Sequence, residues 1–340
     1  MAGYDEPDLI VVGGGPGGCA AALMAAQRGL TVHLLHRDDA ARYQPGETLP
    51  PALKPLFTQL GASEALTNAS RARHSGHSVQ WRGVDRAIEY GGDERGPWLG
   101  FQVCRNTLDR RLREVAIASG VSVTRAAVER PVTDRDGRVV GVIDQRGEHR
   151  ARFVIDAAGA RHWLARALGL TVERVSPRLV ATYGRVTGAL TAGSRTGLVS
   201  TTDGWEWIAE IGDGLFAWVR LTSASESRRR DPPSALSALT PVGATGRADV
   251  TWRRVPMCAG PGYALVGDAS FVVDPSSSHG VLLAVMSGMM AAELIAACRE
   301  GAAPEAVTAE GYRRWAGERF DADVAMLREV YGDMLPIGAL

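Results

Sequence analysis

A glycine-rich turn near the start of the chain has the spacing of a nucleotide-binding loop. Gly13, Gly15 and Gly18 follow the apolar run 9–12 and lead into the alanine-rich run 20–26. This order of strand, tight turn and helix places the free N–H groups and the positive dipole end of the helix against an anion. The turn therefore predicts a dinucleotide pyrophosphate site, although similar turns occur in many α/β proteins.

A second segment, at residues 267–280, has the features of a flavin contact. Asp268 follows the apolar run 263–266, and Pro275 leads through small residues to Gly280 and another apolar helix. In flavoproteins with this pattern, the aspartate binds the ribityl chain and the helix N-terminus faces the flavin pyrimidine edge. Two such segments in this order are much harder to obtain by chance than either one alone. Together they predict one bound FAD.

Length and charge limit the classes to which the protein can belong. The 340 residues suffice for about two domains, and the net charge of +0 gives no reason to expect nucleic acid or an anionic membrane as a partner. No apolar run reaches the length of a membrane helix and the N-terminus lacks the regions of a signal peptide, so we expect a cytoplasmic protein. The four cysteines lack metal or redox spacing, so we expect free thiols and no metal site.

The apolar pattern predicts an α/β fold with an inserted antiparallel sheet. Residues 178–254 contain alternating strands, one of them at 248–254, whereas strands and helices alternate on either side. We expect a discontinuous Rossmann-type FAD-binding domain, a sheet domain that binds substrate, and a C-terminal helical segment. The FAD-binding domain is expected at residues 1–75, 99–177 and 255–300. The sheet domain is expected at 76–98 and 178–254, and the helical segment at 301–340.

Four segments, in order, resemble those of one flavoprotein superfamily. They are the turn 13–18, the loop Gly46-Glu47-Thr48-Leu49-Pro50-Pro51, the central motif 156–161 and the segment 267–280. Over nearly all its length, the chain resembles the flavin monooxygenase and flavin-dependent halogenase superfamily, which has a glutathione-reductase-like fold. The Gly-Glu-Thr-Leu-Pro-Pro loop is similar to that of the branch containing halogenases and hydroxylases of peptide- or carrier-bound aromatic residues, including quinone-cofactor maturases.

The resemblance implies further contacts to FAD. It assigns Arg42 and Arg105 to the pyrophosphate or ribityl region, and Thr48 and Pro50 to positions beside the isoalloxazine. It also assigns Gly159, in the central motif, to the cofactor site. Either arginine could instead lie outside the site, and for Arg105 the alternative is an exposed position on the first turn of a helix.

Two departures from the family pattern concern the nucleotide and the source of electrons. His36 stands where an acidic residue holds the adenosine ribose, so ribose recognition stays open. Ala158 replaces the aspartate that helps couple NADPH to the flavin in single-component hydroxylases, and the chain has no second glycine-rich fingerprint. We infer that NAD(P)H does not bind stably and that a separate flavin reductase supplies reduced flavin.

A third departure is that the halogenase features of the chain are incomplete. Tryptophan-halogenase-like enzymes carry a lysine after the Gly-Glu loop that directs hypohalous acid, but the only lysine here, Lys54, lies too early. An arginine cannot replace it, because guanidinium is effectively never deprotonated. Trp205 and Trp207 match the start of the halogenase Trp-x-Trp-x-Ile-Pro signature, which then fails at Ala209 and Glu210. Both tryptophans point to one face of a strand, where substrate binding and core packing both stay open.

These features predict an FAD-dependent monooxygenase that hydroxylates an aromatic substrate through a flavin C4a-hydroperoxide. The substrate is expected to be a small molecule, or a peptide- or carrier-bound group such as an indole derived from tryptophan. Oxygen transfer needs a dry site and often a base, for which His77 and His279 are the catalytic candidates. A lone histidine is more often structural. The predicted substrate-binding residues are His74, Trp81, Trp205 and Trp207.

Three other functions stay open. They are a flavin-dependent halogenase, an FAD-dependent reductase of an isoprenoid-type substrate, and a catalytically silent flavoprotein that binds a partner. Bound FAD without O₂ consumption after reduction would indicate the last of these.

Overall fold

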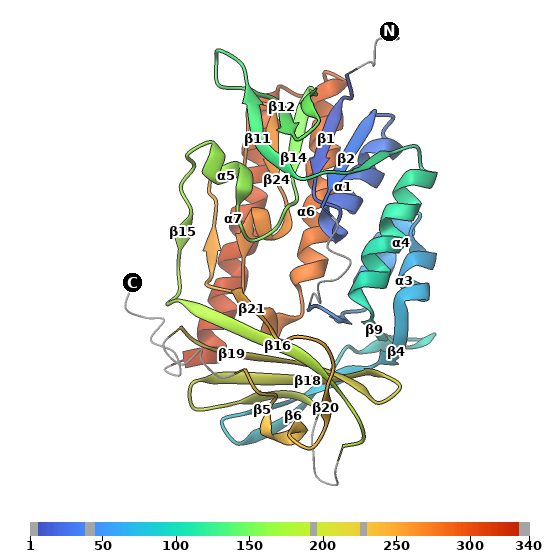
Figure 1. Cartoon of the computed structure of the whole chain (residues 1–340), viewed down its shortest axis with the longest axis vertical. Helices are drawn as coiled ribbons and strands as arrows, with labels where there is room; N and C mark the ends of the chain where they lie inside the picture. Colours follow the sequence, from blue (N-terminus) through green and yellow to red (C-terminus); the bar gives the residue numbers. More distant parts are fainter. Residues whose placement is uncertain (1–5, 38–44, 191–195, 225–229, 333–340) are drawn as a thin grey trace.

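The two largest β-sheets of the described chain lie one above the other, and helices surround the upper one (Figure 1). The computed structural model describes residues 6–37, 45–190, 196–224 and 230–332. A mostly parallel sheet forms the upper half of the molecule as drawn, and an antiparallel sheet lies below it. The predicted α/β fold with an antiparallel sheet is therefore confirmed.

The parallel sheet is built around the strand that precedes the glycine-rich turn. β1 (Leu9–Val12) is completely buried and pairs in parallel with β2 (Val32–His36) and β14 (Phe153–Asp156). A continuous apolar run suits such a strand, because both faces of the sheet are covered. The full order is β10-β2-β1-β14-β24-β23, with β10 (Ser122–Arg125), β24 (Tyr263–Leu265) and β23 (Ala259–Gly260).

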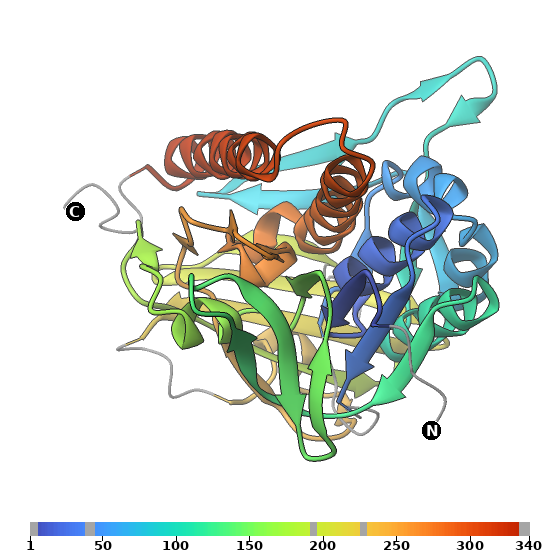
Figure 2. The ribbon, with the colours of Figure 1, turned by 90° about the horizontal axis from the view of Figure 1, so that it is seen from above.

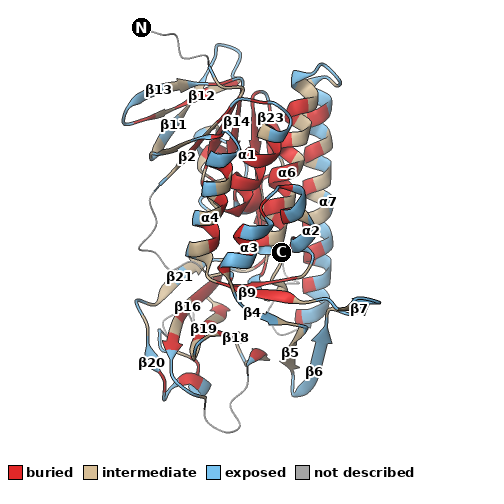
Figure 3. Ribbon diagram, turned by 90° about the vertical axis from the view of Figure 1, so that its right-hand side faces the viewer, coloured by how far each residue is buried: buried red, intermediate tan, exposed pale blue. Residues whose placement is uncertain are grey.

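Two helices pack unusually close together against this sheet. α1 (Pro16–Gln27) and α6 (Gly280–Arg299) make the largest helix contact in the described part of the chain. A Cβ at Gly288 would collide with the carbonyl oxygen of Gly17, and one at Gly17 would lie 2.9 Å from the carbonyl oxygen of Ala284. The small residues of both helices therefore hold the two nucleotide-contacting segments side by side. Beside α1 lies α4 (Arg105–Ala118), and α7 (Glu305–Tyr331) runs from the top of the molecule down to the antiparallel sheet in Figure 3.

The antiparallel sheet takes its strands from two distant segments of the chain. One hairpin comes from the first third of the chain, and the other strands come from residues 179–249. Their order is β20 (Thr240–Pro241), β16 (Leu179–Thr187), β19 (Leu215–Ser223), β18 (Gly204–Gly212), β17 (Gly197–Ser200), β5 (Gly76–Trp81) and β6 (Val84–Glu89), with β21 (Gly246–Asp249) beside β16.

Shorter strands and helices make up the rest of the described chain. β7 (Gly92–Asp93) and β8 (Gly96–Pro97) form a hairpin that projects from the body in Figure 2. The other short strands are β3 (Thr48–Leu49), β4 (Ser70–His74), β9 (Gly100–Val103), β11 (Val128–Thr133), β12 (Val139–Asp144), β13 (Gly147–Arg150), β15 (Glu173–Arg174), β22 (Arg253–Arg254) and β25 (Phe271–Val272). The short helices are α2 (Leu53–Gln59), α3 (Ser63–Ala69), α5 (Trp163–Ala167) and the 3₁₀ turns η1 (Ser234–Leu236), η2 (Gly267–Ala269) and η3 (Pro275–Ser277).

The prediction of one strand at 248–254 is wrong. The chain leaves the antiparallel sheet after Asp249, whose carboxylate accepts the backbone N–H of Thr251 at 3.0 Å and so forms a turn. Trp252 is then fully buried, and β22 joins β15 and β25 in a separate sheet. The apolar alternation continues across the turn because both halves have a buried face, so the pattern does not reveal the break.

α6 is the one described helix whose length and composition would allow it to cross a membrane, with a mean hydropathy of 2.0. It packs on α1 and on α7, and more than half of its apolar window is buried inside the protein. Its apolar character is therefore that of a central core helix.

Candidate functional site

A cavity of about 930 Å³ runs from the glycine-rich turn to the face of the antiparallel sheet. Residues of the turn, of the loop before β3, of α4, of the central motif and of the segment 266–284 line one end and its middle. Residues of β16, β18, β19 and β21 line the other end. One continuous space therefore joins the two predicted nucleotide segments to the sheet.

The glycines of the turn have two different tasks. Gly13 has a φ of +119°, and a Cβ at Gly18 would collide with the carbonyl oxygen of Gly13, so both are required by the turn itself. Gly15 is different, because it has an ordinary φ of −83° and no atom of the described residues lies within 4 Å of the position of its Cβ. It lines the cavity directly at the N-terminus of α1. This open cradle under free helix N–H groups fits a pyrophosphate.

Asp268 lies in η2 at the middle of the cavity. Its side chain is accessible and lines the cavity, and no described residue donates a hydrogen bond to it. Enclosure by the protein raises the pKa of the Asp268 carboxyl, and the nearby cations of Arg253 and Arg105 oppose that shift. A carboxylate that lacks a donor among the described residues and is accessible from the cavity fits a ligand hydroxyl group, as the ribityl chain would present.

Arg105 is a largely buried residue that shapes the loop above the cavity. Its guanidinium donates two hydrogen bonds of 3.2 Å to Asp109 and one of 3.0 Å to the carbonyl oxygen of Pro45. Side-chain exposure is only 12% for Arg105 and 11% for Asp109. The alternative of an exposed residue on a helix turn is therefore excluded. Arg105 lines the cavity and braces the loop that carries Glu47 and Thr48.

The other predicted cofactor residues are distributed unevenly around the cavity. Thr48 lines it, but its hydroxyl donates to Gln102 Oε1 at 2.9 Å. Pro50 is buried and does not line the cavity, and Arg42 lies outside the described residues. The predicted residues that do line it are Gly13, Gly15, Thr48, Arg105, Gly159, Asp268, Pro275 and Gly280.

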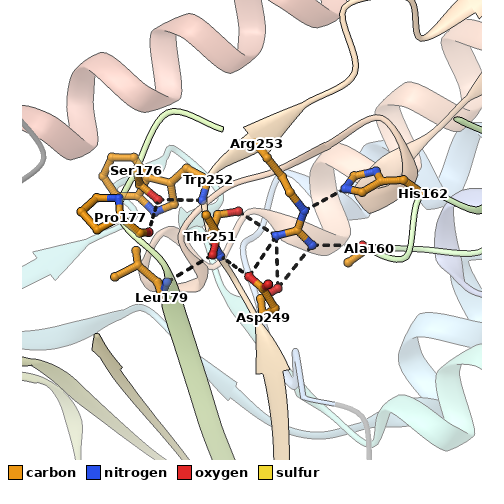
Figure 4. A network of polar contacts seen from close by, with 9 residues as sticks. All are labelled: Ala160, His162, Ser176, Pro177, Leu179, Asp249, Thr251, Trp252 and Arg253. Carbon is orange, nitrogen blue, oxygen red and sulfur yellow. Dashed lines mark hydrogen bonds and ion pairs between the residues drawn. The ribbon is translucent and has the colours of Figure 1, made fainter. Parts of the chain in front are cut away.

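A buried histidine–arginine pair fastens the central motif to the turn that carries Asp268 (Figure 4). His162 Nε2 accepts the Nε–H of Arg253 at 2.8 Å, and Nδ1 lies 2.9 Å from the carbonyl oxygen of Ala269, to which it donates in this neutral tautomer. Arg253 Nη2 also donates to the carbonyl oxygen of Ala160 at 3.0 Å. Burial lowers the pKa of His162. Sequence patterns do not indicate this pair, because its members lie 91 residues apart.

The adenosine end of the cavity is lined by basic and apolar residues. His36 and Arg37, at the end of β2, and Arg113 of α4 all line it. Arg113 donates to the carbonyl oxygen of Gly14 at 2.9 Å, which supports the glycine-rich turn. Trp163 also lines this end, a position that the sequence did not indicate. No described acidic residue stands at the end of β2 to hold a ribose.

An apolar slot forms the sheet end of the cavity. Tyr183, Val219 and Trp207 lie in one row across β16, β19 and β18, and all three line the cavity. Tyr183 leans over Gly246, whereas Trp207 leans towards His77, with ring centroids 5.5 Å apart. Two strand spacings of about 4.8 Å separate the aromatic residues, so their backbones lie about 10 Å apart. We call this space, with its floor of Val219, Ala181, Ala217 and Ala248, the slot.

Trp205 and Trp207 differ in their surroundings. Trp205 is 1% exposed and donates its indole N–H to the hydroxyl of Tyr331 at 2.6 Å. Trp207 is only half-buried, at the side of the slot. Both predicted interpretations therefore apply: Trp205 is mainly core, although it borders the cavity, and Trp207 presents its ring to the cavity.

The four remaining predicted site residues do not line the cavity. His77 lies behind Trp207, and His74 lies nearby with its Nδ1 3.0 Å from the carbonyl oxygen of Gly76. Trp81 packs edge-on against Tyr331 at 5.6 Å. His279, although next to Gly280, has Asp323 and Arg319 of α7 as its charged neighbours. Burial lowers the pKa of His74, His77 and His279 alike. In the described part of the chain, none of the three histidines lines the cavity.

Comparisons with known proteins agree with the cavity. The family model described as FAD binding domain matches residues 6–253. The menaquinone reductase of Mycolicibacterium smegmatis is 30% identical over 325 residues, which cover 85% of this chain and 76% of that protein. The tryptophan 2-halogenase of Chondromyces crocatus is 27% identical over 354 residues, with 90% and 64% coverage. The solved structure of the myxobacterial chondrochloren halogenase CndH superposes with a TM-score of 0.86 at 27% identity, covering 98% of this chain and 84% of that one.

The match spans well over half of the chain, and the residues that form the cavity fit FAD at its pyrophosphate and ribityl positions. The chain belongs to the FAD-dependent monooxygenase and halogenase superfamily, and its cofactor is FAD.

Proposed function

We propose that this protein is an FAD-dependent monooxygenase that hydroxylates an uncharged aromatic group lying in the slot. The observation that carries the proposal is the slot itself, an apolar wall that continues the FAD cavity without interruption. Of the sheet residues that line it, none is Lys, Arg, Asp or Glu. A flat apolar group between Tyr183 and Trp207 would bury its faces against apolar side chains and would not leave a charge unpaired.

The distribution of cations favours oxygen transfer over halogenation. The arginines that line the described cavity, Arg37, Arg105, Arg110, Arg113 and Arg161, belong to its nucleotide end and centre. Lys54 is exposed on α2 and does not line the cavity. Steering of a halogen electrophile by an ammonium group therefore has no candidate among the described cavity residues.

The contribution of the chain to the reaction is exclusion of water and orientation. FAD, when bound, supplies the electrons and the activation of O₂. Val219, Ala181, Ala217 and Ala248 provide a floor without polar side chains, which keeps the reacting end dry. Tyr183 and Trp207 restrict the ring of the substrate to one orientation, and this reduces the entropy cost of reaching the transition state.

A reductase of a quinone- or isoprenoid-type substrate is the second candidate. The identity of 30% to a menaquinone reductase supports it, and an apolar slot also suits a hydrocarbon chain. Such a reaction consumes no O₂, which gives a clear experimental difference from hydroxylation.

The test uses FAD-loaded protein reduced with dithionite, and indole and a prenylated 2-methyl-1,4-naphthoquinone as probes. Each probe is incubated with O₂, with O₂ and bromide, and without O₂. Hydroxylated indole in both aerobic arms supports the proposal. Brominated indole would instead identify a halogenase, and anaerobic reduction of a prenylated naphthoquinone side chain would identify a reductase. The matched control is Ala217→Phe, which fills the slot without touching the nucleotide end.

We also propose that a separate flavin reductase supplies the electrons. Ala158 stands in the central motif, and the described nucleotide end serves one dinucleotide. In anaerobic stopped-flow at the flavin absorbance band, NADPH alone should reduce bound FAD slowly and added flavin reductase should reduce it fast. Rapid stoichiometric reduction by NADPH would show that the enzyme is self-sufficient.

A further inference from the structure

A buried chain of hydrogen bonds connects the end of α7 to two walls of the cavity, one on the flavin-side segment and one on the antiparallel sheet. The hydroxyl of Tyr331, the last residue of α7, donates to Asp274 Oδ2 at 2.5 Å. The Tyr331 hydroxyl oxygen in turn accepts the indole N–H of Trp205 at 2.6 Å. Asp274 and Trp205 both border the cavity, on the flavin-side segment and on the sheet respectively. Tyr331 does not border it and is 0% exposed.

The direction of these bonds is fixed by the donors. An indole nitrogen can only donate, so the Tyr331 oxygen is the acceptor from Trp205 and its own proton must go to Asp274. Asp274 Oδ1 accepts the backbone N–H of Ser276 at 2.8 Å. Both carboxylate oxygens thus accept from neutral donors in the described part of the chain, and the carboxyl is 0% exposed.

This arrangement is costly for the fold. A buried carboxylate without a cationic partner loses its hydration, and neutral donors return only part of it. Burial raises the pKa of the Asp274 carboxyl, while Ser276 and Tyr331 oppose the shift by donating to it. Three other groups hold the Tyr331 end in place: Trp81 and Trp252 pack on its ring at 5.6 Å each, and Arg82 Nη2 donates to its carbonyl oxygen at 2.7 Å.

We propose that Tyr331 is a positioning residue of the substrate site, supplied by the end of α7. It fixes the indole of Trp205 on the cavity wall relative to the Asp274–Pro275 turn on the flavin side, although it touches neither ligand. The proposal rests on the proposed function only in taking the slot as the substrate site. A carboxylate and a hydroxyl are directional partners, so they define the orientation of the indole more narrowly than apolar packing would.

The test compares Tyr331→Phe with Tyr312→Phe in the FAD-loaded full chain. Tyr312 is a matched control, because it lies in the same helix, is 1% exposed and donates its hydroxyl to the carbonyl oxygen of Leu265, away from the slot. The first readout is the set of indole N–H resonances of the eight tryptophans in a ¹H–¹⁵N TROSY spectrum, with Trp205→Phe to assign Trp205. We expect Tyr331→Phe to move the Trp205 resonance upfield and Tyr312→Phe to leave it in place.

The second readout is ligand affinity. Titration with indole, followed by the flavin absorbance, should give a dissociation constant raised about fivefold in Tyr331→Phe, the effect of one lost hydrogen bond. The FAD dissociation constant should change less than the indole constant in this variant, and neither should change in Tyr312→Phe. In a double-mutant cycle, Tyr331→Phe should have little further effect on indole binding once Trp205 is Phe.

Three results would overturn the proposal: an unmoved Trp205 resonance, an unchanged indole constant, or an equal loss of FAD and indole affinity. Should Tyr331→Phe fail to fold, Asp274→Asn, which weakens the same chain, is measured in its place with the same outcomes. If the wild type responds neither to indole nor to the prenylated naphthoquinone, the proposed function of the slot fails, and the Trp205 resonance still decides whether Tyr331 fixes the Trp205 side chain.

Discussion

Substitution of Gly15 by valine tests whether the open face of the glycine-rich turn holds the pyrophosphate of FAD. Gly15 has a φ of −83°, and the position of its Cβ meets no atom of the described residues within 4 Å, so the apoprotein should accept the side chain. The free energy of unfolding of the apoprotein should therefore change by no more than about 0.5 kcal/mol. In the FAD-bound protein, the valine side chain would be forced against the pyrophosphate. Overpacking a close contact costs about 1–3 kcal/mol, so FAD affinity should fall about 5- to 150-fold.

The matched control is Gly18→Ala in the same turn. Its Cβ would collide with the carbonyl oxygen of Gly13, so this smaller change should destabilise the apoprotein itself. Urea unfolding of the two apoproteins and calorimetric titration with FAD separate the two effects. Wild-type FAD affinity in Gly15→Val would refute the assignment of the turn, and so would a Gly15→Val apoprotein as unstable as that of Gly18→Ala.

Three further predictions concern the ribityl position, the buried histidine and the slot. Asp268→Ala should weaken FAD binding about 10- to 150-fold, because a hydrogen bond to a charged group is lost, and Asn should restore part of it; equal affinities in titration would contradict the assignment. Burial lowers the pKa of His162 below 6.5, so its stabilising contribution is complete above that pH and is lost as the pH falls through 6.5 towards the folded-state pKa. The free energy of unfolding, measured with urea, should therefore fall between about pH 7.5 and about pH 5.5 in the wild type, and it should fall less in His162→Gln. Identical decreases in the two proteins would be evidence that neutral His162 does not stabilise the fold. Ala217→Phe should weaken indole binding while FAD affinity stays unchanged. Unchanged indole binding would show that indole does not bind in the slot.

Local patterns predicted the parts of the site that local geometry determines. The glycine-rich turn and Asp268 each follow a buried strand of the parallel sheet, and the carboxyl ends of parallel strands meet at one edge. These local sequence motifs are therefore sufficient to predict FAD without knowledge of tertiary contacts. The α/β class followed from the same alternation of strands and helices.

The contacts that the sequence did not reveal are long-range ones. His162 and Arg253 lie 91 residues apart, and Tyr331 lies 126 residues from Trp205. No spacing rule connects such residues, and a lone tyrosine at the end of an amphipathic helix is indistinguishable from a core residue. The strand position of His77 makes it a base candidate in the sequence, but its ring packs against Trp207, a contact between β5 and β18 that the strand pattern does not reveal.

The origin of the oxygen atom in the product tests the central claim most directly. FAD-loaded protein, reduced with dithionite, is mixed with indole, excess bromide and ¹⁸O₂ for a single turnover, and the product is analysed by mass spectrometry. The account predicts hydroxylated indole that carries one ¹⁸O atom, in equal yield with and without bromide. Brominated indole free of label, or no product with indole but reduction of a prenylated quinone in the absence of O₂, would contradict it.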